Sequence, residues 1–210
     1  INKGINTTLN ATEEVDLAKK LLELNPSMAG VKFARGGGEA MSLAVRIARA
    51  HTKKDKVIFS GYHGWTAWYL ATNISSESNL DEHLLPGLQP SGVPSGLSDT
   101  AIPFNYNDID SFMNVLDSHS DTGVVVLEGA RYSLPNIDFV KTIEVESQKR
   151  GIIVIVDEIT SGLRMSKSGT YSLLNFNPDI VVYGKGLGNG FAISAVLGKK
   201  AVMDSAQETF

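Results

Sequence analysis

One uninterrupted aliphatic stretch constrains the fold more than any other part of the sequence. Residues 151–156 read Gly-Ile-Ile-Val-Ile-Val, without the alternation of apolar and polar side chains that a half-exposed strand shows. Such runs are typical of parallel strands that are covered on both faces. A predicted helix, Ile137–Arg150, precedes it, and strands and helices alternate along the chain. The sequence therefore predicts the α/β class, with a mainly parallel central sheet flanked by helices.

The expected elements follow from periodicity and from Gly and Pro positions. Helices are predicted at 12–24, 39–50, 107–118, 137–150 and 199–207 and around Trp68, and strands at 31–34, 56–59, 123–127, 151–156, 180–183 and 192–197. The last strand follows its predecessor too closely for a crossover helix, so we expect it to pair antiparallel. Thr12 is expected to cap the first helix. Residues 75–100 are expected to form a long irregular loop, a kind of segment that is usually functional or mobile.

Composition excludes several classes of function. A net charge of −4 without a basic run argues against nucleic acid or an anionic membrane as a partner, and no apolar stretch is long enough to span a membrane. The absence of cysteine excludes a disulfide framework and is compatible with the cytoplasm, which is the expected location. His51, His83 and His119 show no metal-site spacing, so they are read as surface or loop residues and no metal is expected.

Polar groups follow four of the predicted strands. They are the glycines 36–38, Glu128, Asp157 and Lys185. Ligands of open parallel sheets bind beyond the carboxyl ends of the strands, so these groups are expected to lie at one edge. The lysine stands in residues 183–190, Tyr-Gly-Lys-Gly-Leu-Gly-Asn-Gly. A partly desolvated lysine becomes a nucleophile toward carbonyl compounds, although the motif alone fits a solvated surface loop equally well.

The other polar groups each have a functional and a purely structural interpretation. Gly37 and Gly38 could offer backbone N–H groups to a phosphate at a helix N-terminus, or could form a packing turn. Asp157 ends a buried strand and needs a partner, which could be a protonated pyridine nitrogen or a nearby Lys or Arg. Tyr62 and His63 could stack on a flat ring or hydrogen-bond in the site, or could simply pack. His63 and Asp157 are possible acid–base groups, but nothing singles out a serine nucleophile.

Five ordered blocks resemble the class III pyridoxal-phosphate aminotransferases, nearest the glutamate-1-semialdehyde aminomutase branch, over nearly the whole chain. The blocks are Val31–Ala40 with Ala44–Ala50, Gly61–Trp65, Asp157–Arg164, Pro178–Ile180 and Gly184–Gly190. The resemblance implies the large domain of the fold type I pyridoxal-phosphate enzymes, with this cofactor bound as an imine to Lys185, the expected catalytic residue. It implies that Asp157 contacts the pyridine nitrogen and that Ile159 and Tyr62 pack on the two ring faces.

The candidate cofactor-binding residues are thus Gly37, Gly38, Tyr62, His63, Glu128, Asp157, Ile159 and Lys185. Two departures from the family pattern matter. Residues 35–38 read Arg-Gly-Gly-Gly where the family commonly has Asn-Ser-Gly-Thr, so that hydroxyl contacts to the phosphate are replaced by backbone contacts or lost. Glu128 is followed by Gly129 where the family usually has proline, which leaves the role of Glu128 less certain.

The function implied is transfer of an amino group between a small-molecule amine and a carbonyl compound, in a homodimer, with Lys185 carrying the proton between substrate and cofactor carbons. Two alternatives stay open: an intramolecular amino shift of the aminomutase type, and a non-catalytic protein or fragment that retains the fold. Family members continue well beyond Phe210 into a small domain. Residues 1–210 are therefore expected to form the cofactor-binding large domain, as a fragment that lacks the N-terminal segment and the C-terminal small domain.

Overall fold

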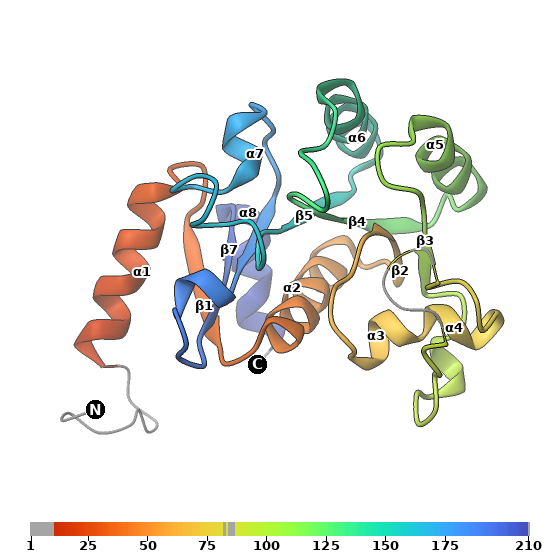
Figure 1. Cartoon of the computed structure of the whole chain (residues 1–210), viewed down its shortest axis with the longest axis horizontal. Coiled ribbons are helices and arrows are strands. Elements are labelled where there is room, and N and C mark those ends of the chain that lie inside the picture. The colour runs from red at the N-terminus through yellow and green to blue at the C-terminus, as the bar shows by residue number, and fades with distance from the viewer. Residues whose placement is uncertain (1–10, 82, 84–86, 210) are drawn as a thin grey trace.

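The computed structural model describes residues 11–81, 83 and 87–209, which form a seven-stranded mixed sheet between two layers of helices (Figure 1). The strands lie in the order β1-β7-β6-β5-β4-β2-β3. Their bounds are β1 Gly30–Ala34, β2 Lys56–Ser60, β3 Ala101–Pro103, β4 Thr122–Glu128, β5 Ile153–Asp157, β6 Ile180–Tyr183 and β7 Ser194–Gly198. The α-helices are α1 Thr12–Leu24, α2 Gly37–Thr52, α3 Ala67–Leu70, α4 Thr72–Ser75, α5 Ile109–Ser118, α6 Ile137–Arg150, α7 Thr170–Leu173 and α8 Lys200–Ser205. Short 3-10 helices are η1 Ser95–Leu97, η2 Lys185–Leu187 and η3 Ala206–Thr209.

The sheet is parallel from β3 through β6, and β7 is antiparallel to both of its neighbours, as predicted. Because β7 runs against both β1 and β6, these two strands run in the same direction. The register pairs Ala34 with Ser194 and Tyr183 with Ala195. The carboxyl ends of β1 and β6 therefore lie on either side of the start of β7, at one edge of the sheet.

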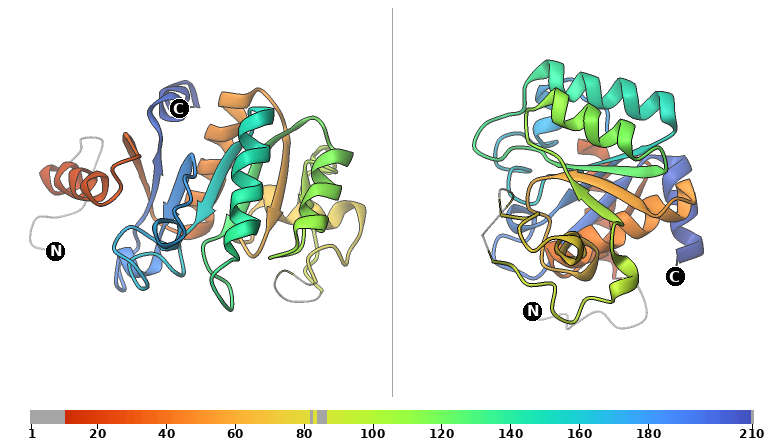
Figure 2. Two further views of the ribbon diagram at one scale, coloured as in Figure 1. Left: turned by 90° about the horizontal axis from the view of Figure 1, so that it is seen from above. Right: turned by 90° about the vertical axis from the view of Figure 1, so that its right-hand side faces the viewer.

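The aliphatic run of β5 is buried on both faces, which confirms the prediction made from its sequence. Ile153 and Ile155 pack in a core that includes residues of α2, α3 and α8. Val154 and Val156 pack in a second core with residues of α1, α5, α6 and α7. Figure 2 shows α2 on the opposite side of the sheet from α5 and α6. The chain is thus an α/β/α sandwich, as the sequence predicted.

Several predicted boundaries were wrong by one or two residues, for local reasons. Helix α1 has Ala11 at its N-cap and begins at Thr12, so the prediction of Thr12 as the cap was wrong. Helix α5 begins at Ile109 because the side chain of Asp108 caps it by accepting from Ser111 N at 2.8 Å. Gly151 has a left-handed φ of 64° and ends α6, so β5 begins only at Ile153.

Other differences concern short elements. Strand β3 and helix α7 were not predicted, since three or four residues carry too little periodicity to be recognised. The long connection at 75–100 is irregular in its described part, apart from the end of α4 and the short η1. Residues 82 and 84–86 of this loop, and Phe210, lie outside the described residues. In the described part of the chain, no helix is both long and apolar enough to cross a membrane.

Candidate functional site

The carboxyl ends of β4, β5 and β6 bring the predicted site residues to one edge of the sheet. Glu128 stands beside Asp157 in the register of β4 and β5, and Asp157 stands beside Val182 in that of β5 and β6. Lys185 follows two residues after the end of β6. The N-terminus of α2 joins them because β1 ends at the same edge. The expected juxtaposition of these groups is therefore present in the fold.

Asp157 has a buried histidine partner. His63 Nδ1 lies 2.9 Å from Asp157 Oδ2, and His63 Nε2 lies 3.1 Å from the carbonyl oxygen of Ser60. A carbonyl oxygen only accepts, so Nε2 carries a hydrogen, and the contact between Nδ1 and the carboxyl group needs a second proton. The imidazole and the carboxyl group are therefore joined by a buried hydrogen bond. The other carboxyl oxygen, Oδ1, accepts from Ile159 N at 2.9 Å, which orients Asp157 from within its own turn.

The same geometry does not form a serine nucleophile. The hydroxyl group of Ser60 is buried and has no hydrogen-bond partner among the described residues. His63 meets the carbonyl oxygen of Ser60 instead of its hydroxyl group. A Ser-His-Asp relay requires the imidazole to accept the hydroxyl proton. Ser60, His63 and Asp157 are thus close together without the arrangement that acyl transfer needs.

Lys185 opens the 3-10 helix η2, with a φ of 37° in the left-handed region. Its Nζ donates to Thr160 Oγ1 at 2.7 Å. The side chain is exposed in this chain, as in the solvated-loop reading of the motif. Thr160 was not among the predicted site residues. Its position three residues after Asp157, in the turn that leaves β5, was the available signal.

Ile159 packs between the two glycine-rich turns. A Cβ atom added at Gly37 would lie 2.9 Å from Ile159 Cδ1, and one added at Gly184 would lie 3.2 Å from Ile159 Cγ2. Both turns therefore lie so close to the Ile159 side chain that a residue with a Cβ at either glycine would force this side chain to move. Gly37 and Gly38 are the first residues of α2, two positions earlier than expected, and N–H groups in a first helical turn lack partners within the helix.

The turn that carries Tyr62 and His63 packs against the start of α2. Gly64 has a φ of 97°, and a Cβ there would lie 3.0 Å from Gly38 Cα. Tyr62 is half-buried, and its ring meets that of Tyr69 edge-on at 5.8 Å. The turn thus packs against the N-terminus of α2 through Gly64.

Glu128 is paired within the chain. Its Oε2 accepts from Arg131 Nη1 at 3.0 Å, and each of these side chains is 15% exposed. Burial raises the pKa of Glu128, while the nearby His63 opposes this rise and Asp157 adds to it. A Cβ at Gly61 would lie 2.5 Å from Glu128 Oε2, so the turn needs glycine to pass this carboxyl group.

His83 lies in the irregular connection, in line with its interpretation as a surface or loop residue, but its side chain is buried and not at the surface. Its Nδ1 accepts from Gly61 N at 3.3 Å, and its carbonyl oxygen accepts from Arg131 Nη2 at 2.6 Å. Burial, together with the positive charges of Arg131 and His63, lowers the pKa of His83 to about 4. The residue therefore stays neutral at pH 7 and attaches its loop to the turn that carries Tyr62.

Glu158 is a fully buried carboxyl group that sequence reasoning missed. Its oxygens accept from Ser161 Oγ at 2.6 Å, from Thr170 Oγ1 at 2.5 Å and from Tyr171 N at 3.1 Å. Burial raises its pKa, and these hydrogen bonds oppose the rise. A Cβ at Gly129 would lie 2.7 Å from Glu158 Cδ, which gives a packing reason for glycine after Glu128. Glu158 thus joins the turn after β5 to the start of α7.

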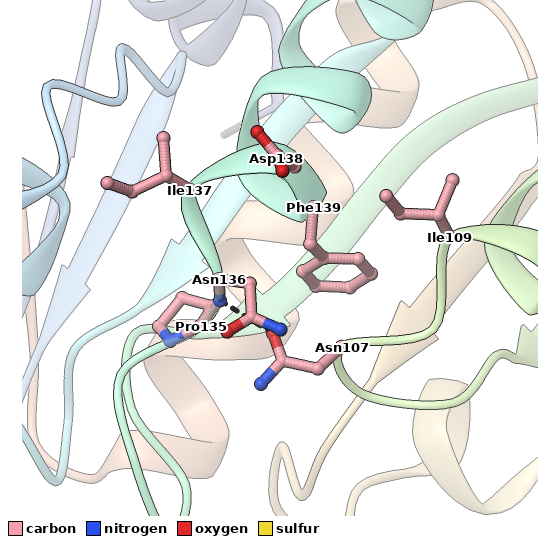
Figure 3. A pocket seen from close by; sticks show the side chains of 7 residues that line it. All are labelled: Asn107, Ile109, Pro135, Asn136, Ile137, Asp138 and Phe139. Carbon is pink, nitrogen blue, oxygen red and sulfur yellow. Dashed lines mark hydrogen bonds between the residues drawn. The ribbon is translucent and has the colours of Figure 1, made fainter.

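A separate depression of about 500 Å³ lies between the N-termini of α5 and α6 (Figure 3). Its lining residues are Asn107, Ile109, Pro135, Asn136, Ile137, Asp138 and Phe139. Asn136 N donates to Asn107 Oδ1 at 2.8 Å, which joins two of its lining segments. Its lining contains none of the predicted site residues and only one charged side chain, that of Asp138. It therefore offers fewer groups for binding or catalysis than the sheet edge does. No group of three or more His, Asp or Glu residues that could hold a metal ion occurs within residues 11–81, 83 and 87–209.

A family model described as "Aminotransferase class-III" matches residues 3–209. The chain belongs to the class-III aminotransferase family. It is 30% identical to the 3-aminobutyryl-CoA aminotransferase of Cloacimonas acidaminovorans (strain Evry), over 96% of this chain and 46% of that protein. It is 34% identical to the glutamate-1-semialdehyde 2,1-aminomutase of Thermodesulfovibrio yellowstonii, over 97% and 48%. An omega-transaminase from Sphaerobacter thermophilus shares its fold with a TM-score of 0.82 at 28% identity, over 96% and 48%.

These matches confirm the resemblance and the fold expected from the sequence. The chain spans about half the length of the curated relatives that it matches. Pyridoxal phosphate is the cofactor that the family match supports, and the residues at the sheet edge fit it. A buried carboxyl group, an exposed amine and free N–H groups at a helix N-terminus are the chemistry that its ring nitrogen, aldehyde and phosphate need.

Proposed function

We propose that this protein transfers an amino group between a small-molecule amine and a carbonyl compound, with pyridoxal phosphate bound covalently to Lys185. One observation carries the proposal: β5 and β6 deliver Asp157 and Lys185 to the edge where α2 begins. When bound, the cofactor supplies an electron sink for the substrate carbon. The residues of this chain then need to bind the cofactor, orient it and move one proton.

Asp157 and His63 would hold the ring. The carboxyl group has lone pairs left beyond its contacts with His63 and Ile159 N, so it can accept a hydrogen bond from a protonated ring nitrogen. The histidine holds Oδ2 of this carboxyl group at 2.9 Å and so fixes its orientation. Because both side chains are buried, the low local dielectric strengthens this contact.

The phosphate would bind at the N-terminus of α2. Gly37 and Gly38 offer N–H groups there, and the helix adds its positive end. Ile159 would pack on one ring face, since it already lies between Gly37 and Gly184. Tyr62 would cover the other face, and Glu128 would lie beside the ring, paired with Arg131.

Lys185 would take up the proton from the substrate carbon and return it at the cofactor carbon. Its backbone is placed by the end of β6, and its side chain is exposed at the edge. An amine released from the cofactor is a suitable base for this step because its neutral form accepts a proton. Asp157, Glu128, His63 and His83 are each held by hydrogen bonds within the protein, whereas the exposed Lys185 amine contacts only a hydroxyl group among the described residues.

The alternative reaction is an intramolecular amino shift, which the aminomutase names of several relatives favour. The two reactions differ in their need for a second substrate. An aminomutase converts a single amino-aldehyde without an added keto acid, and a transferase does not. A non-catalytic protein stays as a third reading, favoured by the glycines at 36–38, which lack hydroxyl groups, and opposed by the presence of both Lys185 and Asp157.

We also infer that residues 1–210 form the cofactor-binding large domain of such an enzyme, and that the enzyme is a cytoplasmic homodimer. The family resemblance is the ground for the homodimer. Trp65 and Phe191, which are 75% and 73% exposed, are candidate residues of its interface. The absence of cysteine is compatible with a reducing compartment.

Borohydride reduction tests the assignment of Lys185. The protein is incubated with saturating pyridoxal phosphate, reduced and digested, and the modified peptide is sequenced by mass spectrometry. We expect the label on Lys185 and its loss in the Lys185→Arg variant. The matched control, Lys167→Arg, changes another exposed lysine and should keep the label. A label on another residue, or none at saturating cofactor, would contradict the proposed function.

A further inference from the structure

Thr160 is the hydrogen-bond partner of the candidate catalytic lysine. Its Oγ1 lies 2.7 Å from Lys185 Nζ, across 25 positions of sequence. Among the described residues, no carboxylate forms an ion pair with Lys185, so a neutral hydroxyl group is what holds the amine. Both side chains are exposed, so the contact depends on local geometry and not on burial in the core.

The turn around Thr160 contacts the glycine-rich segment 183–190, which carries Lys185. The carbonyl oxygen of Thr160 accepts from Arg164 Nη1 at 3.2 Å. The side chain of Arg164 continues across this segment, where a Cβ added at Gly186 would lie 3.6 Å from its Nε. One residue earlier, Ile159 N donates to Asp157 Oδ1. The same short turn therefore orients the carboxyl group for the ring nitrogen and places a hydroxyl group at the amine.

A hydroxyl group suits a lysine that changes its protonation state. It can accept a hydrogen bond from an ammonium group and can donate one to a neutral amine, whereas a carboxylate only accepts and favours the ammonium form. In the proposed reaction Lys185 is free while the substrate occupies the cofactor, and it passes through both forms as it moves a proton. Thr160 can therefore hold Nζ of Lys185 in one place in both the ammonium form and the neutral form.

We propose that Thr160 is a positioning residue for Lys185, whose hydroxyl group holds the lysine amine at the reacting centre whenever this amine is not attached to the cofactor. The inference rests on the proposed function for its role in catalysis. The contact itself belongs to the protein without cofactor. The two parts can therefore be tested separately.

The contact is tested by acylation of the cofactor-free protein. Acetic anhydride is added at limiting concentration, and the acetylation of Lys185 is measured by peptide mass spectrometry relative to exposed Lys167. Thr160→Val keeps the β-branched shape and removes the hydroxyl group, whereas Thr160→Ser keeps the hydroxyl group. Hydrogen bonding protects the amine, so Thr160→Val should raise the relative labelling of Lys185 at least about threefold, and Thr160→Ser should stay within about twofold of the wild type. Equal labelling in the wild type and Thr160→Val overturns the proposal.

The role is tested with the loaded enzyme. We expect Thr160→Val to lower kcat about tenfold with little change in KM, because the hydroxyl group acts on Lys185 and not on substrate binding. Thr160→Ser should restore most of the rate. An unchanged kcat in Thr160→Val, or a serine variant as slow as the valine variant, overturns the role. Failure of the proposed function is recognised separately, because borohydride would then leave no label on Lys185 of the wild type.

Discussion

His63 Nδ1 lies 2.9 Å from Asp157 Oδ2, although 94 positions of sequence separate the two residues. Both side chains are buried, and each is the main polar partner of the other. Removal of one member would leave the other buried without its side-chain partner, and an unpaired buried charge is strongly destabilising. The same pair therefore contributes both to the stability of the fold at this sheet edge and to the binding of the cofactor.

Loss of the histidine should affect stability and cofactor binding together. We expect His63→Leu to lower the free energy of unfolding by about 3 kcal/mol, measured by urea denaturation. It should also weaken pyridoxal phosphate binding by about tenfold or more, measured by absorbance titration. His63→Asn retains a donor near the position of Nδ1 and should show smaller losses in both. Equal losses in the two variants would contradict the role given to the hydrogen bond.

A methyl group at Gly37 should disturb the cofactor site with little effect on stability. The new Cβ would lie 2.9 Å from Ile159 Cδ1, the end of a flexible side chain, so Ile159 can move away. We expect Gly37→Ala to weaken pyridoxal phosphate binding about tenfold while the melting temperature stays within about 3 °C of the wild type. The control is Gly36→Ala, whose Cβ would meet nothing within 4 Å. If both variants bind the cofactor equally well, Ile159 does not pack on the ring.

A methyl group at Gly129 should instead destabilise the fold. Its Cβ would overlap Thr170 Oγ1 and lie 2.7 Å from Glu158 Cδ, inside a fully hydrogen-bonded cluster that cannot move easily. We expect Gly129→Ala to lower the free energy of unfolding by about 2 kcal/mol and the melting temperature by about 5 °C. Gly96→Ala, where the added Cβ meets nothing within 4 Å, is the control for calorimetry. A melting temperature equal to that of the control would contradict this packing explanation.

His83 should make stability depend on pH in the acid range. Its pKa is about 4 in the folded protein against 6.5 in the unfolded chain, so between these values the unfolded state binds more protons. The free energy of unfolding therefore falls as pH decreases from about 6.5 to about 4, and the contribution is fully present only above that window. Asparagine cannot be protonated there and can still accept from Gly61 N.

Urea denaturation at a series of pH values measures this dependence. We expect the difference in unfolding free energy between the wild type and His83→Asn to shift in favour of the variant as the pH falls from 6.5 to 4. Other titrating groups contribute to both proteins and cancel in the difference. A difference that stays constant over this window would show that His83 is protonated in the folded protein.

Local patterns predicted most of the fold. The run at 151–156 indicated a strand buried on both faces, and Ile155 and Val156 pack in opposite cores. The position of Asp157 and Lys185 at one edge followed from the rule that parallel strands carry ligands at their carboxyl ends. The short elements β3 and α7 could not be predicted, because their formation depends on neighbours distant in sequence.

The sequence by itself determined which functional groups follow the strands and in what order along the chain. These groups are a glycine turn, a carboxyl group and a lysine, each directly after a strand. Only the tertiary structure decided how these groups are paired. Asp157 with His63, Lys185 with Thr160 and Glu128 with Arg131 are contacts whose distances depend on side-chain direction and on turn geometry. It also decided that His83 is buried and Lys185 is exposed. Periodicity reports which face of an element is apolar, whereas burial and hydrogen bonding depend on what the rest of the chain places against that face.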